Sequence, residues 1–295
     1  MRIGLSLPQY GPLCRADEVA SFAREAETLG YGSFWVGDRI LTPLEPSDIY
    51  PGFTPDRPYP PEFTAFLDPL VVLSAAATVT RTARLGTSTL NAPWHTPLLL
   101  GRSLTSLDQL SGGRLDVGLG IGWLRDEYAS TNTPWERRGA LLDEMLDALT
   151  TMWTTNPVEH SGATWRIPPA RLDLRPTQQP HPPVLLGGTS PAALRRVGRR
   201  AAGWLAVPVP PAVLTSMWDT IRVAAEDAGR DPDGLRRELR VNPPAGTDLA
   251  DVARHVAAAR TAGMDGVFVD LHYLATDPAH ALDLAAHLWK LIEER

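Results

Sequence analysis

Side chains that could transfer protons or bind anions follow several predicted strands in this sequence, at the point where each strand ends. Asp38 and Arg39 come directly after the apolar run 33–36, and His95 follows the β-like run 84–88 by a few residues. A carboxylate, a guanidinium and an imidazole could together move protons and bind an anionic oxygen. Because the carboxyl ends of parallel strands meet at one edge, we expect these three groups to converge.

The stretch GRLDVGLGIGWLRDEY (113–128) places glycines at alternate positions, Gly118, Gly120 and Gly122, and then Trp123. Glycine weakens a strand, so it usually marks a place where another group approaches the backbone closely. The spacing G-x-G-x-G differs from the G-x-G-x-x-G of dinucleotide sites, which argues against a nicotinamide site. We expect instead that a flat ring lies against the bare backbone.

The stretch GGTSPA (187–192) has the features of an anion site. Gly187 and Gly188 would let a ligand approach the backbone, while Ser190 as N-cap and Pro191 at the first position begin a helix. The free N–H groups at such a helix start favour a phosphate. An ordinary turn between a strand and a helix is the alternative, and the local sequence leaves both open.

Several classes of function are disfavoured by composition and by missing motifs. The single cysteine, Cys14, excludes an internal disulfide and a cysteine-based metal cluster, and no metal-binding His-Glu pattern or serine nucleophile elbow is present. His95 and His272 could do acid–base work or could be structural. A net charge of −6 offers no field for nucleic acid, and no apolar run reaches the length of a membrane span. We expect a cytoplasmic protein with a small-molecule substrate, no metal, and no nucleic-acid or membrane partner.

β-like runs and amphipathic helical stretches alternate along the whole chain. Strands are predicted at 2–7, 33–36, 84–88, 114–118, 184–186, 203–206, 239–242 and 266–270. Helices are predicted at 19–29, 97–110, 141–153, 190–200, 212–228, 249–262 and 279–293.

This alternation predicts an α/β protein, a single (β/α)₈ TIM barrel over residues 1–295, with a doubly wound sheet as the alternative. Two Pro-rich segments are too long to be simple connections: 37–66 after the second strand and 154–183 before the fifth. Long segments of this kind tend to be lids or binding loops. The first would rise from the carboxyl-terminal face of the barrel and could cover its mouth.

Three segments give the sequence a resemblance to the bacterial luciferase-like superfamily of flavin- and deazaflavin-dependent oxidoreductases. They are GYGSFWVGDR (30–39), DPLVVLSAAATVTRTARLGTSTLNAPWHTPLLLGRSLTSLDQLSGGRLDVGLGIGWLRDEY (68–128) and PPVLLGGTSPAALRRVGRRAAGWL (182–205). The match covers roughly residues 1–207, and the remainder matches only as alternating strands and helices. The sequence looks most similar to the branch described as F420-dependent, and the resemblance implies a possible homodimer.

The resemblance also implies which residues hold the cofactor and the substrate. The ring would lean on a bulge at Ser88–Thr89, often a cis peptide in this family. Trp94, Trp123 and Arg39 would line the substrate pocket, and Asp38, Arg39 and His95 are the catalytic candidates. Matching cofactor-contact positions are Asp38, Ser88, Thr89, Asn91, Ile121, Gly122, Asp126, Gly187, Gly188, Ser190 and Pro191.

Two positions depart from the sugar-phosphate dehydrogenases of this superfamily. Arg39 stands where those enzymes carry a histidine, and Trp123 where they carry a glutamate. A guanidinium is no base near neutral pH and an indole is no carboxylic acid, so alcohol oxidation by that route is disfavoured. The resulting hypothesis is F420-dependent hydride transfer with a small organic substrate. The alternatives are an FMN-dependent monooxygenase using O₂ and a cofactor-binding protein without turnover.

Overall fold

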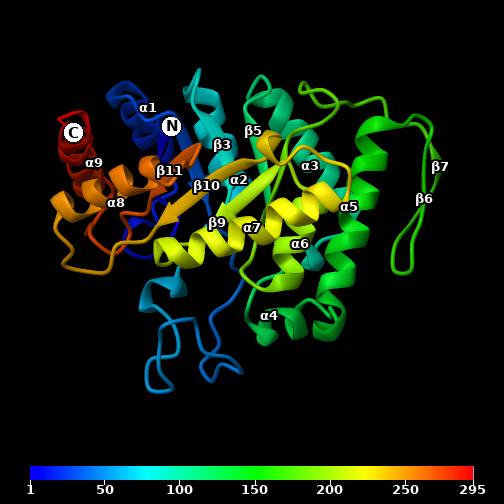
Figure 1. Cartoon of the computed structure of the whole chain (residues 1–295), viewed down its shortest axis with the longest axis horizontal. Helices are drawn as coiled ribbons and strands as arrows, with labels where there is room; N and C mark the ends of the chain where they lie inside the picture. The colour runs from blue at the N-terminus through cyan, green and yellow to red at the C-terminus, as the bar shows by residue number, and fades with distance from the viewer. Residues whose placement is uncertain (295) are drawn as a thin grey trace.

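The computed structural model describes residues 1–294, in which strands and helices alternate along the chain (Figure 1). In hydrogen-bonded order the barrel strands are β3 (Arg84–Thr87), β2 (Ser33–Val36), β1 (Arg2–Ser6), β11 (Gly266–Val269), β10 (Arg236–Val241), β9 (Gly203–Ala206), β8 (Val184–Gly187) and β5 (Leu115–Gly120). All neighbours are parallel, and β3 also pairs with β5, which closes the ring. The closure confirms the (β/α)₈ TIM barrel and excludes the doubly wound sheet.

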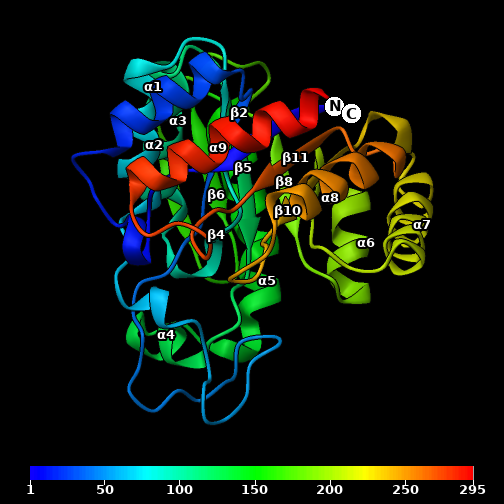
Figure 2. The ribbon, with the colours of Figure 1, turned by 90° about the vertical axis from the view of Figure 1, so that its left-hand side faces the viewer.

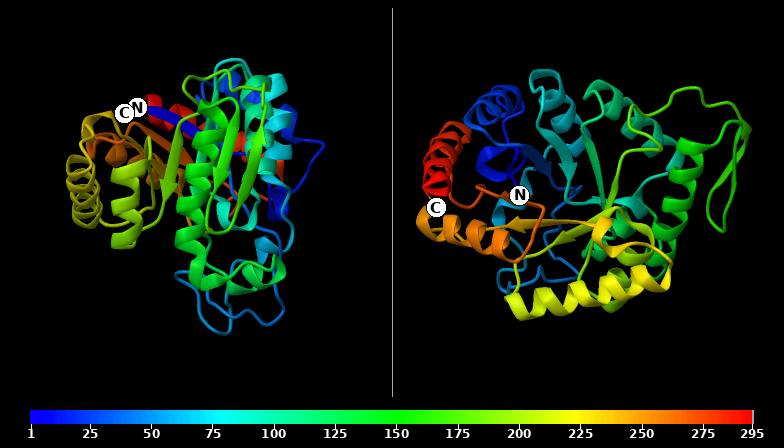
Figure 3. Two further views of the ribbon diagram at one scale, coloured as in Figure 1. Left: turned by 90° about the vertical axis from the view of Figure 1, so that its right-hand side faces the viewer. Right: turned by 45° about the horizontal axis from the view of Figure 1, so that its top comes forward.

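The helices lie outside the strands, as the view toward the end of the barrel shows (Figure 3). Every predicted helix is present, but the prediction missed α2 and α4. Residues 69–79 are apolar almost throughout and show no helical period, although Asp68 caps the helix by accepting from the N–H groups of Leu70 and Val71. The helices are α1 (Val19–Leu29), α2 (Pro69–Val79), α3 (Pro97–Leu110), α4 (Arg125–Ser130), α5 (Arg138–Thr154), α6 (Pro191–Arg200), α7 (Pro211–Asp227), α8 (Leu249–Thr261) and α9 (Pro278–Glu293).

The middle of the barrel is filled by large apolar side chains. Trp35 and Phe268 stack with their ring centroids 4.7 Å apart, and Leu185 and Leu205 complete this buried cluster. Alternate residues of a strand point to opposite faces, so one inward position per strand supplies each layer. The apolar layer separates a polar end of the barrel from its mouth.

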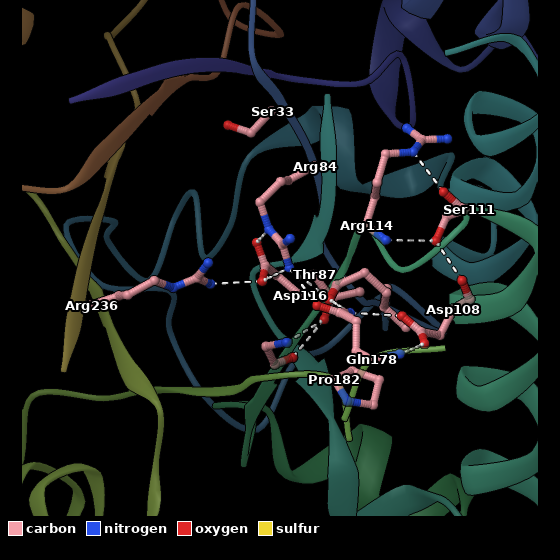
Figure 4. Close-up of polar contacts among 12 residues, drawn as sticks. Ser33, Arg84, Thr87, Asp108, Ser111, Arg114, Asp116, Gln178, Pro182 and Arg236 are labelled. Carbon is pink, nitrogen blue, oxygen red and sulfur yellow. Dashed lines mark hydrogen bonds and ion pairs between the residues drawn. The ribbon is translucent and has the colours of Figure 1, made fainter. Parts of the chain in front are cut away.

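The amino-terminal end of the barrel holds a network of ion pairs (Figure 4). Asp116 is fully buried and lies between two arginines, with an oxygen 2.5 Å from Arg84 Nη2 and 2.7 Å from Arg236 Nη2. Beside it, Gln178 donates to Asp108 and to the Leu115 carbonyl oxygen, at 2.7 Å each. This network fastens the segment before β8 to the bottom of the barrel.

The two long segments differ in structure. Segment 37–66, which contains the 3₁₀ turn Pro61–Thr64, lies beside α4 at the carboxyl ends of the strands (Figures 1 and 2). Segment 154–183, expected as a loop, forms an antiparallel hairpin of β6 (Val158–Ser161) and β7 (Arg166–Ala170) that projects beside α5. Among residues 1–294, no helix is long and apolar enough to cross a membrane.

Candidate active site at the barrel mouth

Asp38, Asn91 and His95 come together where β2 and the short strand β4 (Leu90–Asn91) end. The Asp38 carboxylate accepts from the Asn91 backbone N–H at 2.8 Å, and the Asn91 side-chain amide donates to the Asp38 carbonyl oxygen at 3.1 Å. His95 Nε2 lies 3.9 Å from Asp38 Oδ2. Of the three groups expected to converge, Asp38 and His95 lie together, and this imidazole and carboxylate stand close enough to share a proton through a ligand or a water.

Arg39 is held between two aromatic rings. Its guanidinium lies 4.7 Å from the ring centroids of both Phe63 and Trp123. The edge of Trp123 also packs against Tyr50, at a centroid distance of 5.2 Å. A face of Trp123 therefore carries Arg39, so this indole positions the guanidinium as well as lining the mouth.

Glu127 is the counter-charge of Arg39, a role that the sequence interpretation did not assign to it. Its carboxylate is fully buried, lies 3.6 Å from Arg39 Nη1, and accepts from the Ile40 N–H at 3.1 Å. Burial raises the pKa of Glu127 to about 7, against the opposing effect of the Arg39 charge. The neighbouring Asp126, a predicted cofactor contact, instead accepts from the Ser47 N–H at 2.8 Å and hydroxyl at 3.1 Å.

The sequence of α4 does not decide which of these two acids faces the barrel. Adjacent residues of a helix point about 100° apart, so only one of Asp126 and Glu127 can face the barrel. Which of them does so depends on how α4 packs, and six residues give too short a pattern to decide.

The glycines of β5 clear space for the protein itself. A Cβ atom on Gly118 would lie 1.7 Å from the Thr87 carbonyl oxygen, and one on Gly120 would lie 2.3 Å from the Thr89 hydroxyl. Gly122 adopts a φ of 65°, which favours glycine. The space beside Gly118 and Gly120 is taken by Thr87 at the end of β3 and by Thr89, so these glycines are explained without a ring, and the expected ring contact stays a prediction.

Ser88–Thr89 is a cis peptide bond, as the resemblance implied. The Ser88 carbonyl oxygen accepts from Arg240 Nη1 at 3.4 Å, and Arg240 also pairs with Asp270. The functional candidates from sequence did not include Arg240, because it lies inside a strand rather than after one. This arginine links the bulge after β3 to the opposite side of the barrel.

His272 belongs to a buried hydrogen-bond network around Asp270. Tyr10 donates to Asp270 Oδ2 at 2.8 Å, and His272 contacts Asp270 Oδ1 while its Nε2 accepts from the Gln9 N–H at 3.3 Å. Burial alone would raise the pKa of Asp270, but His272 and Arg240 hold it well below its usual range. His272 is thus a structural histidine with both ring nitrogens engaged.

The GGTSPA stretch forms the turn from β8 into α6. Gly188 has a φ of 123° and its carbonyl oxygen accepts from the buried Trp204 indole at 3.4 Å. Ser190 is the N-cap and accepts from the Ala193 N–H at 3.3 Å, with Pro191 as the first residue of the helix. Residues 188–191 are exposed, so the start of α6 is open to an anion.

Unpartnered polar atoms gather near the carboxyl ends of the barrel strands. Within residues 1–294, six buried polar atoms near the carboxyl ends of the strands have no hydrogen-bond partner: Trp94 Nε1, His95 Nε2, Trp123 Nε1, Glu127 Oε2, Arg240 Nε and Asn242 Oδ1. Buried polar groups are rarely left unpaired, so these atoms are expected to pair with ordered water or with a ligand. In the same part of the chain, no group of three His, Cys, Asp or Glu side chains could hold a metal ion.

Both the fold and the sequence place the protein in a class of barrel oxidoreductases. Residues 2–287 match the model of the luciferase-like monooxygenase family, and the chain belongs to this family. An uncharacterized protein of Mycobacterium tuberculosis is 32% identical over 232 residues, which are 74% of this chain and 82% of the relative.

Two solved structures share the fold over nearly the whole chain. The monooxygenase RslO1 from Streptomyces bottropensis superposes with a TM-score of 0.79 at 22% identity, covering 100% of this chain and 98% of that one. An F420-dependent secondary alcohol dehydrogenase in complex with an F420-acetone adduct gives a TM-score of 0.78 at 15% identity, covering 99% and 98%.

Proposed function

We propose that this member of the family transfers hydride between coenzyme F420 and a small, partly apolar organic substrate. The observation that carries the proposal is the set of unpartnered buried polar atoms near the carboxyl ends of the barrel strands, together with the contact between His95 and Asp38. The solved F420-dependent dehydrogenase with the same fold supports the choice of coenzyme.

When bound, the coenzyme would supply the hydride chemistry, and the chain would orient the reactants, exclude water and move protons. Ser88, Thr89 and Asn91 would hold the ring, and the start of α6 would hold the phosphate. His95 and Asp38 would hold and deliver a proton to the substrate. Arg39 would hold an anionic oxygen of the substrate or of the coenzyme.

The direction of reaction follows from the residues at positions 39 and 123. An acid–base pair contributes about 10²–10⁴-fold in rate, so a site with arginine and tryptophan there should oxidise glucose 6-phosphate negligibly. Reduction of an activated C=C or C=N bond takes up one hydride and one proton, and the proton can come from water or from the pair of Asp38 and His95.

The test measures binding first and turnover second. Fluorescence titration with F420 and with FMN gives the two affinities. Oxidation of reduced F420 is then followed by absorbance under anaerobic conditions with a panel of enones and imines, and reduction of F420 with glucose 6-phosphate. Rapid turnover of glucose 6-phosphate would overturn the proposal.

An FMN-dependent monooxygenase is the second candidate, favoured by the way segment 37–66 is anchored beside the mouth. Gln9 bonds to both stems of the loop, with its side-chain amide donating to the carbonyl oxygens of Gly37 at 2.8 Å and Leu67 at 2.9 Å. A covered site suits a reduced flavin that must react with O₂ away from water, and the solved monooxygenase has the same fold. Turnover only with reduced FMN and oxygen would favour this candidate, and tight cofactor binding without any turnover would favour a binding protein.

A further inference from the structure

Arg39 is a charged group with unused hydrogen-bonding capacity. Only 7% of its side chain is exposed, and within residues 1–294 the guanidinium contacts two aromatic faces and one carboxylate oxygen at 3.6 Å, without a hydrogen bond. A guanidinium has five N–H donors, and its planar fork fits a carboxylate. Phe63 and Trp123 fix the plane of that fork, so it is ready to accept a ligand.

Glu127 already supplies the charge that such a ligand would bring. A substrate carboxylate at Arg39 would stand near the buried Glu127 carboxylate, whose Oε2 has no partner. Two carboxylates on one guanidinium in a buried site repel each other unless one binds a proton.

We propose that the substrate carries a carboxylate or a similar anionic oxygen beside its reducible bond, and that it binds Arg39 together with uptake of one proton by Glu127. The inference rests on the proposed function and names the substrate class of that site. The proton moves from solvent to the Glu127 carboxylate, and no covalent bond to the substrate forms. Arg39 then pairs with the substrate carboxylate, while Glu127 is neutral.

Other titratable groups lie near Arg39 and Glu127 and influence this proton uptake. Asp38 after β2, Tyr50 in the loop and Tyr273 after β11 lie within its electrostatic range. Burial raises the pKa of Tyr273, so this hydroxyl stays neutral near pH 7. Burial raises the pKa of Glu127 to about 7, so its uptake of a proton can be measured between about pH 6 and 9.

The experiment is isothermal titration of the protein, with and without oxidised F420, using 3-oxocyclohex-1-ene-1-carboxylate and its methyl ester as probes. Repeating each titration in buffers of different ionisation enthalpy gives the protons taken up. At pH 8 we expect close to one proton with the carboxylate and none with the ester. Above pH 7 the affinity for the carboxylate should fall about tenfold per pH unit.

Three variants sharpen the result. Glu127→Gln should abolish the proton uptake and make carboxylate binding independent of pH between 6 and 9, while the ester is unaffected. Glu238→Gln, which removes another buried carboxyl group with a pKa of about 7 far from Arg39, should retain the uptake. Should Glu127→Gln not fold, Arg39→Met in its place should lose carboxylate binding and keep ester binding.

Carboxylate binding without proton uptake, or equal affinities for acid and ester, would overturn the inference. Proton-linked carboxylate binding by a protein that binds neither F420 nor FMN would leave the inference standing and overturn the proposed function. Turnover of reduced F420 with no proton uptake on carboxylate binding would support the proposed function and overturn the inference.

Discussion

The two ends of the barrel contain charged side chains in different states of pairing. At the amino-terminal end Asp116 accepts hydrogen bonds from Arg84 and forms an ion pair with Arg236 at 2.7 Å, although Arg236 Nε and Nη2 make no hydrogen bond within residues 1–294. At the mouth Arg39 and Glu127 stand 3.6 Å apart and several polar atoms are unpaired. The first end is organised for stability and the second for a ligand, which agrees with the usual division of labour in TIM barrels.

Glu238 is an exception at the stable end. Its side chain is buried and neither carboxylate oxygen has a partner within residues 1–294, while a Cβ atom on the adjacent Gly266 would lie 1.8 Å from Oε2. The glycine therefore makes room for this carboxyl group, and burial raises the pKa of Glu238 to about 7, against the opposing charge of Arg236.

The largest effect on stability should come from Asp116→Ala. The substitution leaves Arg84 and Arg236 without their buried counter-charge, which typically costs about 3–5 kcal/mol. Asp143→Ala is the matched control, because it breaks a half-exposed pair with Arg196 at 2.7 Å and should cost under about 1 kcal/mol. Urea denaturation measures both. Equal losses would contradict the view that the lower ion pairs stabilise the barrel.

Thr189→Glu should have the largest effect on cofactor binding. A carboxylate at the exposed start of α6 repels a phosphate, so F420 or FMN affinity should fall about tenfold or more with little change in Tm. This substitution is a cleaner test than a β-branched residue at Gly188, where a φ of 123° and a Cβ contact of 2.6 Å with Ala193 would also strain the fold. Thr215→Glu on the exposed face of α7 is the control. Unchanged affinity in Thr189→Glu would remove GGTSPA from the site.

Glu238→Gln should change how stability depends on pH. The pKa of Glu238 is raised in the folded state, so the folded protein binds more protons than the unfolded chain between about pH 4.5 and 7. Stability from this group is therefore greatest below that window and is lost as the pH rises through 7. Relative to wild type, the variant should gain about 1–3 kcal/mol on moving from pH 5 to pH 8, measured by urea denaturation. A pH-independent difference would contradict the assignment.

The smallest effect concerns the cover over the mouth. Asp126→Ala removes both bonds to Ser47, so segment 37–66 should open more often and be cut about three- to tenfold faster by a protease. Cofactor and substrate should slow the cleavage in wild type. Asp17→Ala, which breaks an exposed pair with Arg15, should leave the cleavage rate unchanged. Equal cleavage with and without ligands would argue against a lid.

The sequence by itself determined most of the barrel. Strand and helix periods reflect local burial, so the predicted barrel strands are present with ends shifted by at most three residues. The positions of Asp38, Asn91 and His95 after predicted neighbouring strands also predicted that they would lie close together, because the carboxyl ends of parallel strands meet at one edge. The short helix α4 and the uniformly apolar α2 were missed, since neither contains a readable period.

Only the tertiary structure decided which charged groups work together. Arg39 and Glu127 are 88 positions apart in the chain, yet their pairing depends on how α4 meets the loop after β2. The same applies to Arg240 and Ser88, and to Gly118 and Gly120 of β5, whose close neighbours are protein atoms. Ion pairing, burial and pKa depend on distances between residues that are far apart in the chain. Those distances are set by the closed barrel and cannot be inferred from the local sequence.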